Sequence, residues 1–135
     1  MTPRLLLVLT LACLYGSACA ARGPWQNGVS SWYGPGYAGK PTASGEPFRP
    51  SHRTAAHRTL PFGTKLLVTT EDGKRRVRVT INDRGPFVAG RTLDLSRRAA
   101  RRLQGIDAGV FPVRFRVVGC NPRYAERNPR TGCKR

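Results

Sequence analysis

Apolar and polar residues alternate along several short stretches of the chain. From residue 76 to residue 81, Val77, Val79 and Ile81 alternate with two arginines and a threonine. A period of two is typical of a β-strand with one buried face. The same pattern predicts six strands in all, which span residues 28–33, 54–57, 65–70, 74–81, 91–95 and 113–117.

The segments between these strands predict turns and one helix. Asp72-Gly73 is a strong hairpin signal between two of the strands. Ser96 is a suitable N-cap for a helix over residues 97–104, and Gly105 would end it. Six short strands and one helix indicate a mainly β fold that closes into a small barrel, because so short a chain cannot leave long sheet edges exposed.

The first twenty residues have a different pattern. A single arginine precedes an apolar run from Leu5 to Tyr15, and small residues follow. This predicts a secretory signal peptide over residues 1–20 and a linker over 21–27, since the run is too short to remain as a membrane span. Two cleavage sites compete. Ala18-Cys19-Ala20 suits ordinary signal peptidase, whereas residues 16–19 resemble a bacterial lipobox that would be lipidated at Cys19 and anchored to the membrane.

Two cysteines remain in the body of the exported chain. Cys120 and Cys133 can pair in an oxidising compartment. The bond would close the basic tail over residues 119–135 and contribute roughly 3 kcal/mol to stability.

The charge balance limits the partners. The chain has 135 residues and a formal net charge of +17, so it must attract polyanions. The basic residues are spread along the chain without any recognised nucleic-acid motif, and an export signal would be of no use to a cytosolic nucleic-acid binder. We therefore expect no specific nucleic-acid partner, and anionic envelope polymers instead.

A long polar loop over residues 34–51 is rich in Gly, Pro, Ser and Thr and is large enough to bind a ligand. Trp32, Tyr33 and Tyr37 cluster at its start, as flat aromatic side chains do in sugar-binding sites. The alternative is that at least one of them, Tyr33 in particular, fills the core.

Elimination among the seven carboxylates and two histidines leaves one main candidate for chemistry. Asp83 shares the parity of the apolar residues before it, so its carboxylate should point with the buried side chains or lie at the mouth of the barrel. Alone, the run Asn82-Asp83-Arg84-Gly85-Pro86 also reads as an ordinary turn. The sequence shows no metal-ligand spacing, no serine-hydrolase signature and no phosphate-binding loop. What remains is acid-base chemistry by Asp83, with or without His57, or no chemistry.

Five motifs in order resemble the rare lipoprotein A (RlpA) family of septal-ring lytic transglycosylases, from about Gly28 to Val118. They are Gly28-Val29-Ser30-Ser31-Trp32-Tyr33-Gly34, Thr42-Ala43-Ser44-Gly45-Glu46, the run 54–64 around His57, Ile81-Asn82-Asp83-Arg84-Gly85-Pro86-Phe87, and Asp94-Leu95-Ser96.

The resemblance implies a six-stranded double-psi β-barrel and a peptidoglycan substrate, in particular glycan strands without stem peptides. It places the family's catalytic aspartate at Asp83 and its histidine at His57, with no metal or cofactor. Glu46 and Asp94 also match family positions and are expected to contact substrate or support loops. The predicted substrate-binding set is Trp32, Tyr33, Tyr37, Thr42, Ser44, Glu46, Arg84 and Asp94.

Two functions of different classes stay open. A lytic transglycosylase needs one acid-base carboxylate, whereas a hydrolase usually needs two. The rival is a non-catalytic, expansin-like module that binds wall polysaccharide. The presence of both Asp83 and His57 favours the enzyme.

We expect an exported monomer in the periplasm, at the outer membrane or secreted. The basic tail stands where many family members carry a septum-binding SPOR domain, so the resemblance carries no expectation about septal recruitment.

Overall fold

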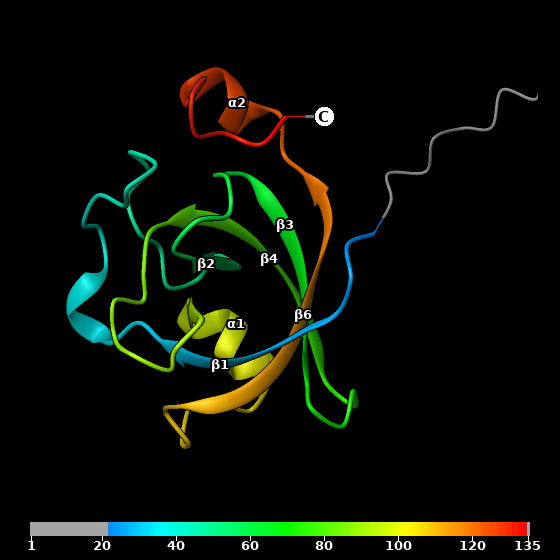
Figure 1. Cartoon of the computed structure of the whole chain (residues 1–135). Helices are drawn as coiled ribbons and strands as arrows, with labels where there is room; N and C mark the ends of the chain where they lie inside the picture. Colours follow the sequence, from blue (N-terminus) through cyan, green and yellow to red (C-terminus); the bar gives the residue numbers. More distant parts are fainter. Residues whose placement is uncertain (1–21, 135) are drawn as a thin grey trace, which may run out of the picture.

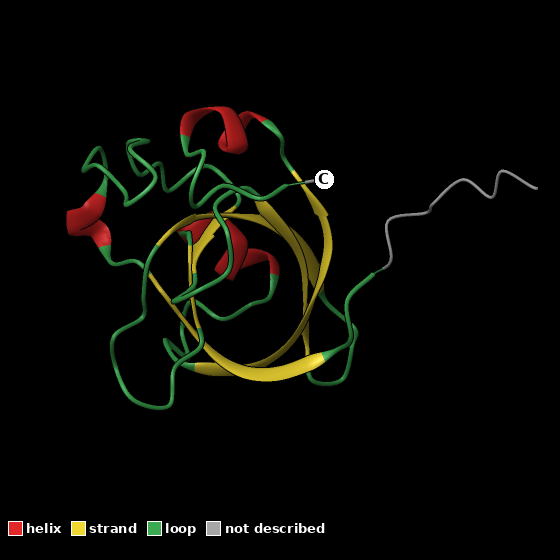
Figure 2. Cartoon of the chain, turned by 45° about the horizontal axis from the view of Figure 1, so that its top comes forward, coloured by secondary structure: helices red, strands yellow, loops and turns green. Residues whose placement is uncertain are grey.

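Six strands close into a barrel, as predicted, in the computed structural model, which describes residues 22–134 (Figures 1 and 2). The strands are β1 (Gln26–Trp32), β2 (Thr54–Ala56), β3 (Thr64–Thr70), β4 (Arg76–Asp83), β5 (Leu93–Leu95) and β6 (Phe111–Cys120). The helical segments are a 3-10 turn η1 (Pro35–Tyr37) and two α-helices, α1 (Arg97–Arg102) and α2 (Arg123–Arg127). The expected signal peptide and the lipidation at Cys19 lie outside the described residues.

The strands follow one another around the ring in the order β1-β5-β2-β4-β3-β6. The pairs β1/β5 and β2/β4 are parallel, and the other four pairs are antiparallel. Parallel neighbours cannot be joined by a tight turn, so the long connections gather at the ends of the barrel. In Figure 2 these loops cross above the ring of strands.

The apolar positions of the alternating pattern fill the barrel. Each buried Val, Leu, Ile or Phe side chain contributes about 1.5–3 kcal/mol relative to exposure. The core includes Leu66, Val68, Val77, Val79, Ile81, Leu93, Leu95, Val113 and Phe115, each no more than 4% exposed.

The expected linker over residues 21–27 is part of the barrel in its described part. β1 begins at Gln26, which pairs with Phe115, and the Gly23 N–H donates to the Val117 carbonyl at 2.9 Å. The long strand β6 offers backbone partners to this segment. The domain therefore extends beyond the expected limits of 28–118 at both ends.

The helix α1 begins where it was expected and ends two residues early. The Ser96 hydroxyl caps it by accepting from the Ala99 N–H at 3.3 Å. After Arg102 the backbone tightens, and Gln104 adopts the left-handed conformation with φ of 56°. Gly105 is needed for close packing rather than for the turn, because a Cβ there would lie 2.0 Å from the Phe111 ring.

The tail contains a second helix where only an irregular segment was expected. Cys120 and Cys133 form a disulfide, and α2 lies above the barrel between them (Figure 1). The Asn121 side chain accepts from the Arg123 N–H at 3.2 Å, and Tyr124, which is 8% exposed, packs into the core. Of the helices that the structure describes, none has the length and apolar character to cross a membrane.

Candidate active site

Asp83 ends β4 at the mouth of the barrel. The pairing of β4 with β2 skips one residue, because Ala55 lies opposite Ile81 and Ala56 lies opposite Asp83. Asn82, the skipped residue, is 5% exposed, and Asp83 is half-buried. Such a bulge re-aims side chains near a strand end, and here it follows the last buried residue of the strand.

Three donors hold the Asp83 carboxylate, and they treat its two oxygens differently. Oδ1 accepts from the backbone N–H groups of Ala43 at 2.9 Å and Arg84 at 2.8 Å. Oδ2 accepts from the Tyr33 hydroxyl at 2.6 Å. Backbone N–H groups can only donate, so Oδ1 is fixed as an acceptor. A hydroxyl can also accept, so Oδ2 is the oxygen that can carry and release a proton.

Tyr33 is a fixed structural partner of the acid. Its ring packs on Phe48 at 4.4 Å and on Tyr37 at 5.5 Å between centroids. Burial raises the pKa of Tyr33 far above its ordinary value, and the hydrogen bond to Asp83 raises it further. The phenol therefore stays protonated and able to donate.

His57 directly follows β2 and lies beside Asp83. Its backbone N–H donates to the Asp83 carbonyl at 3.2 Å. The ring Nδ1 accepts from the N–H groups of Thr59 at 3.1 Å and Leu60 at 3.0 Å, which assigns the ring proton to Nε2. Burial lowers the pKa of His57, and the charges of Arg84 and Arg58 lower it further. The site thus presents an Nε2–H donor.

Arg84 holds the loop that carries His57. Its Nη1 donates to the carbonyls of Leu60 at 2.8 Å and His57 at 3.3 Å. The guanidinium lies 4.0 Å from the centroid of the Phe62 ring, and its burial lowers the pKa of Arg84. These contacts give Arg84 a scaffolding role. That it also binds substrate stays a prediction.

The predicted site residues Thr42 and Ser44 shape the loop that reaches Asp83. The Thr42 hydroxyl donates to the Glu46 carbonyl at 2.8 Å, and its oxygen lies 3.0 Å from the Ser44 hydroxyl. The Ser44 N–H donates to the Asn82 carbonyl at 3.2 Å. Both hydroxyls are buried. They stabilise the turn that delivers the Ala43 N–H to the acid.

The two other predicted carboxylates lie on different sides of Asp83. Asp94 accepts a hydrogen bond from the Ser31 hydroxyl. Ala56 pairs with both Asp83 and Asp94, so these two backbones are two strand spacings apart, roughly 10 Å. Asp94 therefore lies two strands away from Asp83 around the barrel.

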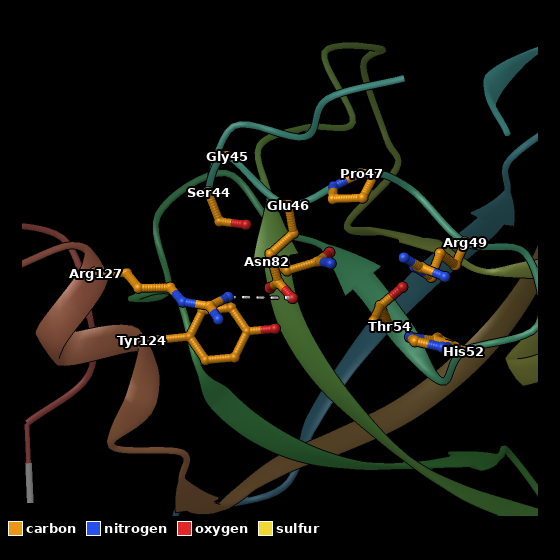
Figure 3. Close-up of a pocket in the computed structure, with 10 residues that line it drawn as sticks. All are labelled: Ser44, Gly45, Glu46, Pro47, Arg49, His52, Thr54, Asn82, Tyr124 and Arg127. Atoms are coloured by element: carbon orange, nitrogen blue, oxygen red, sulfur yellow. Dashed lines mark ion pairs between the residues drawn. The ribbon is translucent and has the colours of Figure 1, made fainter. Parts of the chain in front are cut away.

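Glu46 faces the tail instead (Figure 3). Its carboxylate lies 3.9 Å from the Arg127 guanidinium. Burial raises the pKa of Tyr124, and the neighbouring Glu46 raises it further. These residues line a hollow of about 560 Å³ with Ser44 and Asn82. Asp83 and His57 do not line it. The loop 42–46 contacts Asp83 and also lines the hollow. No side chain of the hollow contacts the Asp83 carboxylate.

The aromatic residues differ in how accessible they are. Trp32 donates from Nε1 to the Ile106 carbonyl at 3.3 Å and, with Tyr33, lines a separate hollow of about 330 Å³. Tyr37 is 52% exposed. Phe87, in the loop after Asp83, is 82% exposed and was not among the predicted site residues. The signal for it was an aromatic directly after a Gly-Pro turn.

Comparison with known proteins places the chain in a family. Residues 25–115 match the family model described as "Lytic transglycolase". A probable endolytic peptidoglycan transglycosylase RlpA of a Nostoc species is 56% identical over 94 residues, which cover 68% of this chain and 25% of that protein. The endolytic peptidoglycan transglycosylase RlpA of Campylobacter jejuni is 47% identical over 105 residues, 78% of this chain and 38% of that protein. This chain therefore covers well under half the length of either relative.

A solved structure supports the fold alone. A Clavibacter michiganensis expansin mutant in complex with cellohexaose matches 71% of this chain and 51% of its own, with a TM-score of 0.57 and 24% identity. Together with the closed six-stranded barrel, the family model and the two relatives show that this chain belongs to the RlpA family of double-psi β-barrel proteins.

Proposed function

We propose that this chain is a peptidoglycan lytic transglycosylase that cleaves the bond between N-acetylmuramic acid and N-acetylglucosamine in glycan strands without stem peptides. One observation carries the proposal. Asp83 lies at the barrel mouth, where two backbone N–H groups occupy its Oδ1. Only Oδ2 can therefore exchange a proton, and its hydrogen-bond partner is a hydroxyl rather than a second carboxylate.

The reaction needs one group that acts twice. Protonated Asp83 gives its Oδ2 proton to the glycosidic oxygen, and the bond from that oxygen to the anomeric carbon of the muramic residue breaks. The resulting carboxylate takes a proton from the 6-hydroxyl of the same sugar, whose oxygen bonds to the anomeric carbon. The acid is restored, no water is consumed, and the product ends in 1,6-anhydro-muramic acid.

His57 acts on the substrate in this scheme. Because Nδ1 is occupied by two backbone donors, the ring can offer only the Nε2–H. No hydrogen bond joins the imidazole to the Asp83 carboxylate among the described contacts. We assign His57 to hold a sugar oxygen near the acid, and Tyr33 to position the carboxylate.

The exposed aromatic residues suit a sugar strand. Tyr37 and Phe87 come from the loops that border Asp83, and flat apolar rings stack on sugar faces. Such a substrate lies outside the cytoplasm, in agreement with the predicted export of the chain. We propose that the protein acts as a monomer without a metal or cofactor.

The test compares Asp83→Asn with the parent on purified glycan strands. The amide keeps an acceptor for the Ala43 and Arg84 N–H groups but cannot supply a proton, so turnover should fall by at least ~10²-fold with little change in thermal stability. Asp107→Asn, at an exposed loop position, is the matched control and should keep parental activity. Mass spectrometry should find parental products one water lighter than hydrolysis products.

The rival function is a non-catalytic wall-binding module, which the expansin-like fold favours. It predicts that the parent and Asp83→Asn bind strands equally and that neither cleaves them. Products that incorporate solvent oxygen would instead indicate hydrolysis, for which Glu46 and Asp94 are the candidate second carboxylates. Either result would exclude the transglycosylase proposal.

A further inference from the structure

Three hollows follow one another along the outer face of β4. Alternate residues of that strand line them in turn: Asn82 lines the first, Thr80 and Arg78 the second, and Arg78 and Arg76 the third. Their volumes are about 560, 700 and 470 Å³. Six residue steps of a strand cover roughly 20 Å. The hollows therefore extend from the neighbour of Asp83 to the opposite end of the strand.

Shared lining residues connect these hollows into one groove, which we call the β4 groove. The first and second share His52, Thr54 and Tyr124. The second and third share Arg53 and Arg78. The first hollow is the one that contains Ser44 and Glu46 and is drawn in Figure 3.

The β4 groove is lined by cations along its whole length. Its only carboxylate is Glu46, at the end near Asp83, where Arg127 pairs with it. That is the single ion pair between side chains in residues 22–134, so the other cations of the groove have no carboxylate partner there. The ten Arg and Lys residues that line the groove are Arg22, Arg49, Arg53, Lys65, Arg76, Arg78, Arg98, Arg102, Arg116 and Arg127.

The strand register keeps these charges close together. Leu67 of β3 lies opposite both Arg78 and Arg116, so the two arginines are two strand spacings apart, roughly 10 Å. Like charges at this separation repel each other, and the fold gains nothing from the arrangement. Arg116 is held further by stacking on Trp25, at 4.6 Å from the ring centroid. A row of guanidinium groups without carboxylate partners among the described residues is complementary to an extended anion.

We propose that the β4 groove binds the carboxylates of a glycan strand whose stem peptides have been removed, as the continuation of the segment bound at Asp83. Each muramic residue of such a strand carries a free lactyl carboxylate, so the charges recur at regular intervals. An intact stem converts this carboxylate into a neutral amide and adds bulk. The groove would thus select stripped strands. This inference rests on the proposed function and adds to it the feature of the substrate that is recognised.

The test measures binding in the Asp83→Asn background, so that no strand is cleaved. The ligands are stripped strands and the same strands with their carboxylates converted to methyl amides. The protein should bind the carboxylate form roughly tenfold more tightly, because several exposed ion pairs, each weak alone, act together. Adding Arg76→Gln and Arg78→Gln should bring the ratio of the two affinities close to one.

The matched control adds Arg101→Gln and Arg130→Gln, which remove the same charge from exposed positions outside the groove. It should keep the tenfold ratio. Equal affinity for the two ligands before any arginine is changed would overturn the proposal without relying on a variant. An equal loss of affinity in the groove variant and in the control variant would also overturn it. So would a phosphate polymer that binds the groove and that stripped strands cannot displace. If the parent cleaves strands but shows no preference for carboxylates, only the proposal for the β4 groove is excluded. If binding depends on carboxylates but no strand is cleaved, only the proposed enzymatic function is excluded.

Discussion

At the scale of single residues, the main feature is the unequal treatment of the two Asp83 oxygens. Two backbone N–H groups fix Oδ1, and only the Tyr33 hydroxyl contacts Oδ2. A hydroxyl can accept as well as donate, whereas a backbone N–H can only donate. Tyr33 is therefore the partner that can keep a hydrogen bond to Asp83 whether the carboxyl group is charged or protonated.

Replacing Tyr33 with Phe tests this role. The variant keeps the ring contacts but removes the donor to Oδ2, so we expect kcat to fall about tenfold with little change in KM, as for the loss of one positioned hydrogen bond. Tyr37→Phe is the control, since no hydrogen bond of its hydroxyl is described. An unchanged kcat in Tyr33→Phe would indicate that Tyr33 only fills space.

The depressed pKa of His57 makes a prediction about stability. A folded-state pKa below the ordinary value of 6.5 means that the unfolded chain binds the proton more readily. The free energy of unfolding should then decrease as pH falls below about 6.5 and level off once the folded-state histidine is also protonated. Protonation would also break the bonds that Nδ1 accepts from Thr59 and Leu60.

His57→Asn should remove this part of the pH dependence. The Asn side-chain oxygen can still accept from the loop, but it does not titrate. Denaturant unfolding between pH 7.5 and pH 5 should show a smaller loss of stability in the variant than in the parent. His52→Asn, at an exposed position, should keep the parental slope. Parallel curves for the parent and His57→Asn would contradict the neutral, buried imidazole.

At the scale of elements, the tail supports the loop that presents His57. The Phe62 N–H donates to the Thr131 carbonyl at 2.8 Å, and the Cys133 N–H donates to the Phe62 carbonyl at 2.7 Å. Phe62 in turn lies under Arg84, whose guanidinium holds the His57 carbonyl. The disulfide-closed segment is thus linked to the histidine through two side chains, although it lies outside the part matched by the family model.

Two glycines test the packing of the tail against this loop. Gly63 has φ of 89°, and a Cβ there would lie 2.7 Å from the Tyr124 Cβ and 2.9 Å from the Cys133 Sγ. Gly73, in the hairpin, has φ of 71° with open space around it. Gly73→Ala should cost about 1–2 kcal/mol from the backbone alone. Gly63→Ala should cost about 1–3 kcal/mol more and also reduce activity. Equal shifts in denaturation midpoint would mean that the tail does not pack as described.

The same elements show what sequence could and could not predict. The period of two predicted the longer strands, because burial on one face dictates it. β2 is buried along its whole length and does not alternate. The start of β1 was missed because Gln26 and Asn27 are polar and are recruited by pairing with β6. The five-residue helix α2 has no periodic pattern and packs through one residue, Tyr124. Its place in the structure depends on tertiary contacts that local sequence does not encode.

The sequence motifs predicted side chains of the candidate site, but they could not predict the backbone that positions them. Asp83 and His57 were found from their motifs, and the structure brings them together. The Ala43 N–H, which holds the acid, belongs to a residue with no functional side chain. Arg84 was included in the predicted substrate-binding set with the motif around Asp83, and this assignment stays a prediction. Which carbonyl oxygens Arg84 reaches depends on how the loop 57–63 folds back.

At the scale of the whole molecule, the barrel separates two tasks. The loops at its mouth carry Asp83 and His57, and the outer face of β4 carries the row of cations. The inner face of the same strand supplies Val77, Val79 and Ile81 to the core. The alternation that builds the barrel therefore also determines which residues can face a polyanion. The charged side chains lie outside the core and do not interrupt its packing.

The net charge of +17 gives the last prediction, which concerns binding to intact cell-wall sacculi. Most of the cations are exposed, so their attraction to an anionic wall is screened by salt, with a Debye length that falls from about 10 Å at 0.1 M to about 3 Å at 1 M. Sedimentation with purified sacculi should show affinity decreasing steeply across this range. Intact sacculi washed free of anionic polymers would be the control for wall charge. Binding that stays constant from low to high salt would assign the affinity to the exposed aromatic residues Tyr37 and Phe87, since stacking on sugars does not depend on ionic strength.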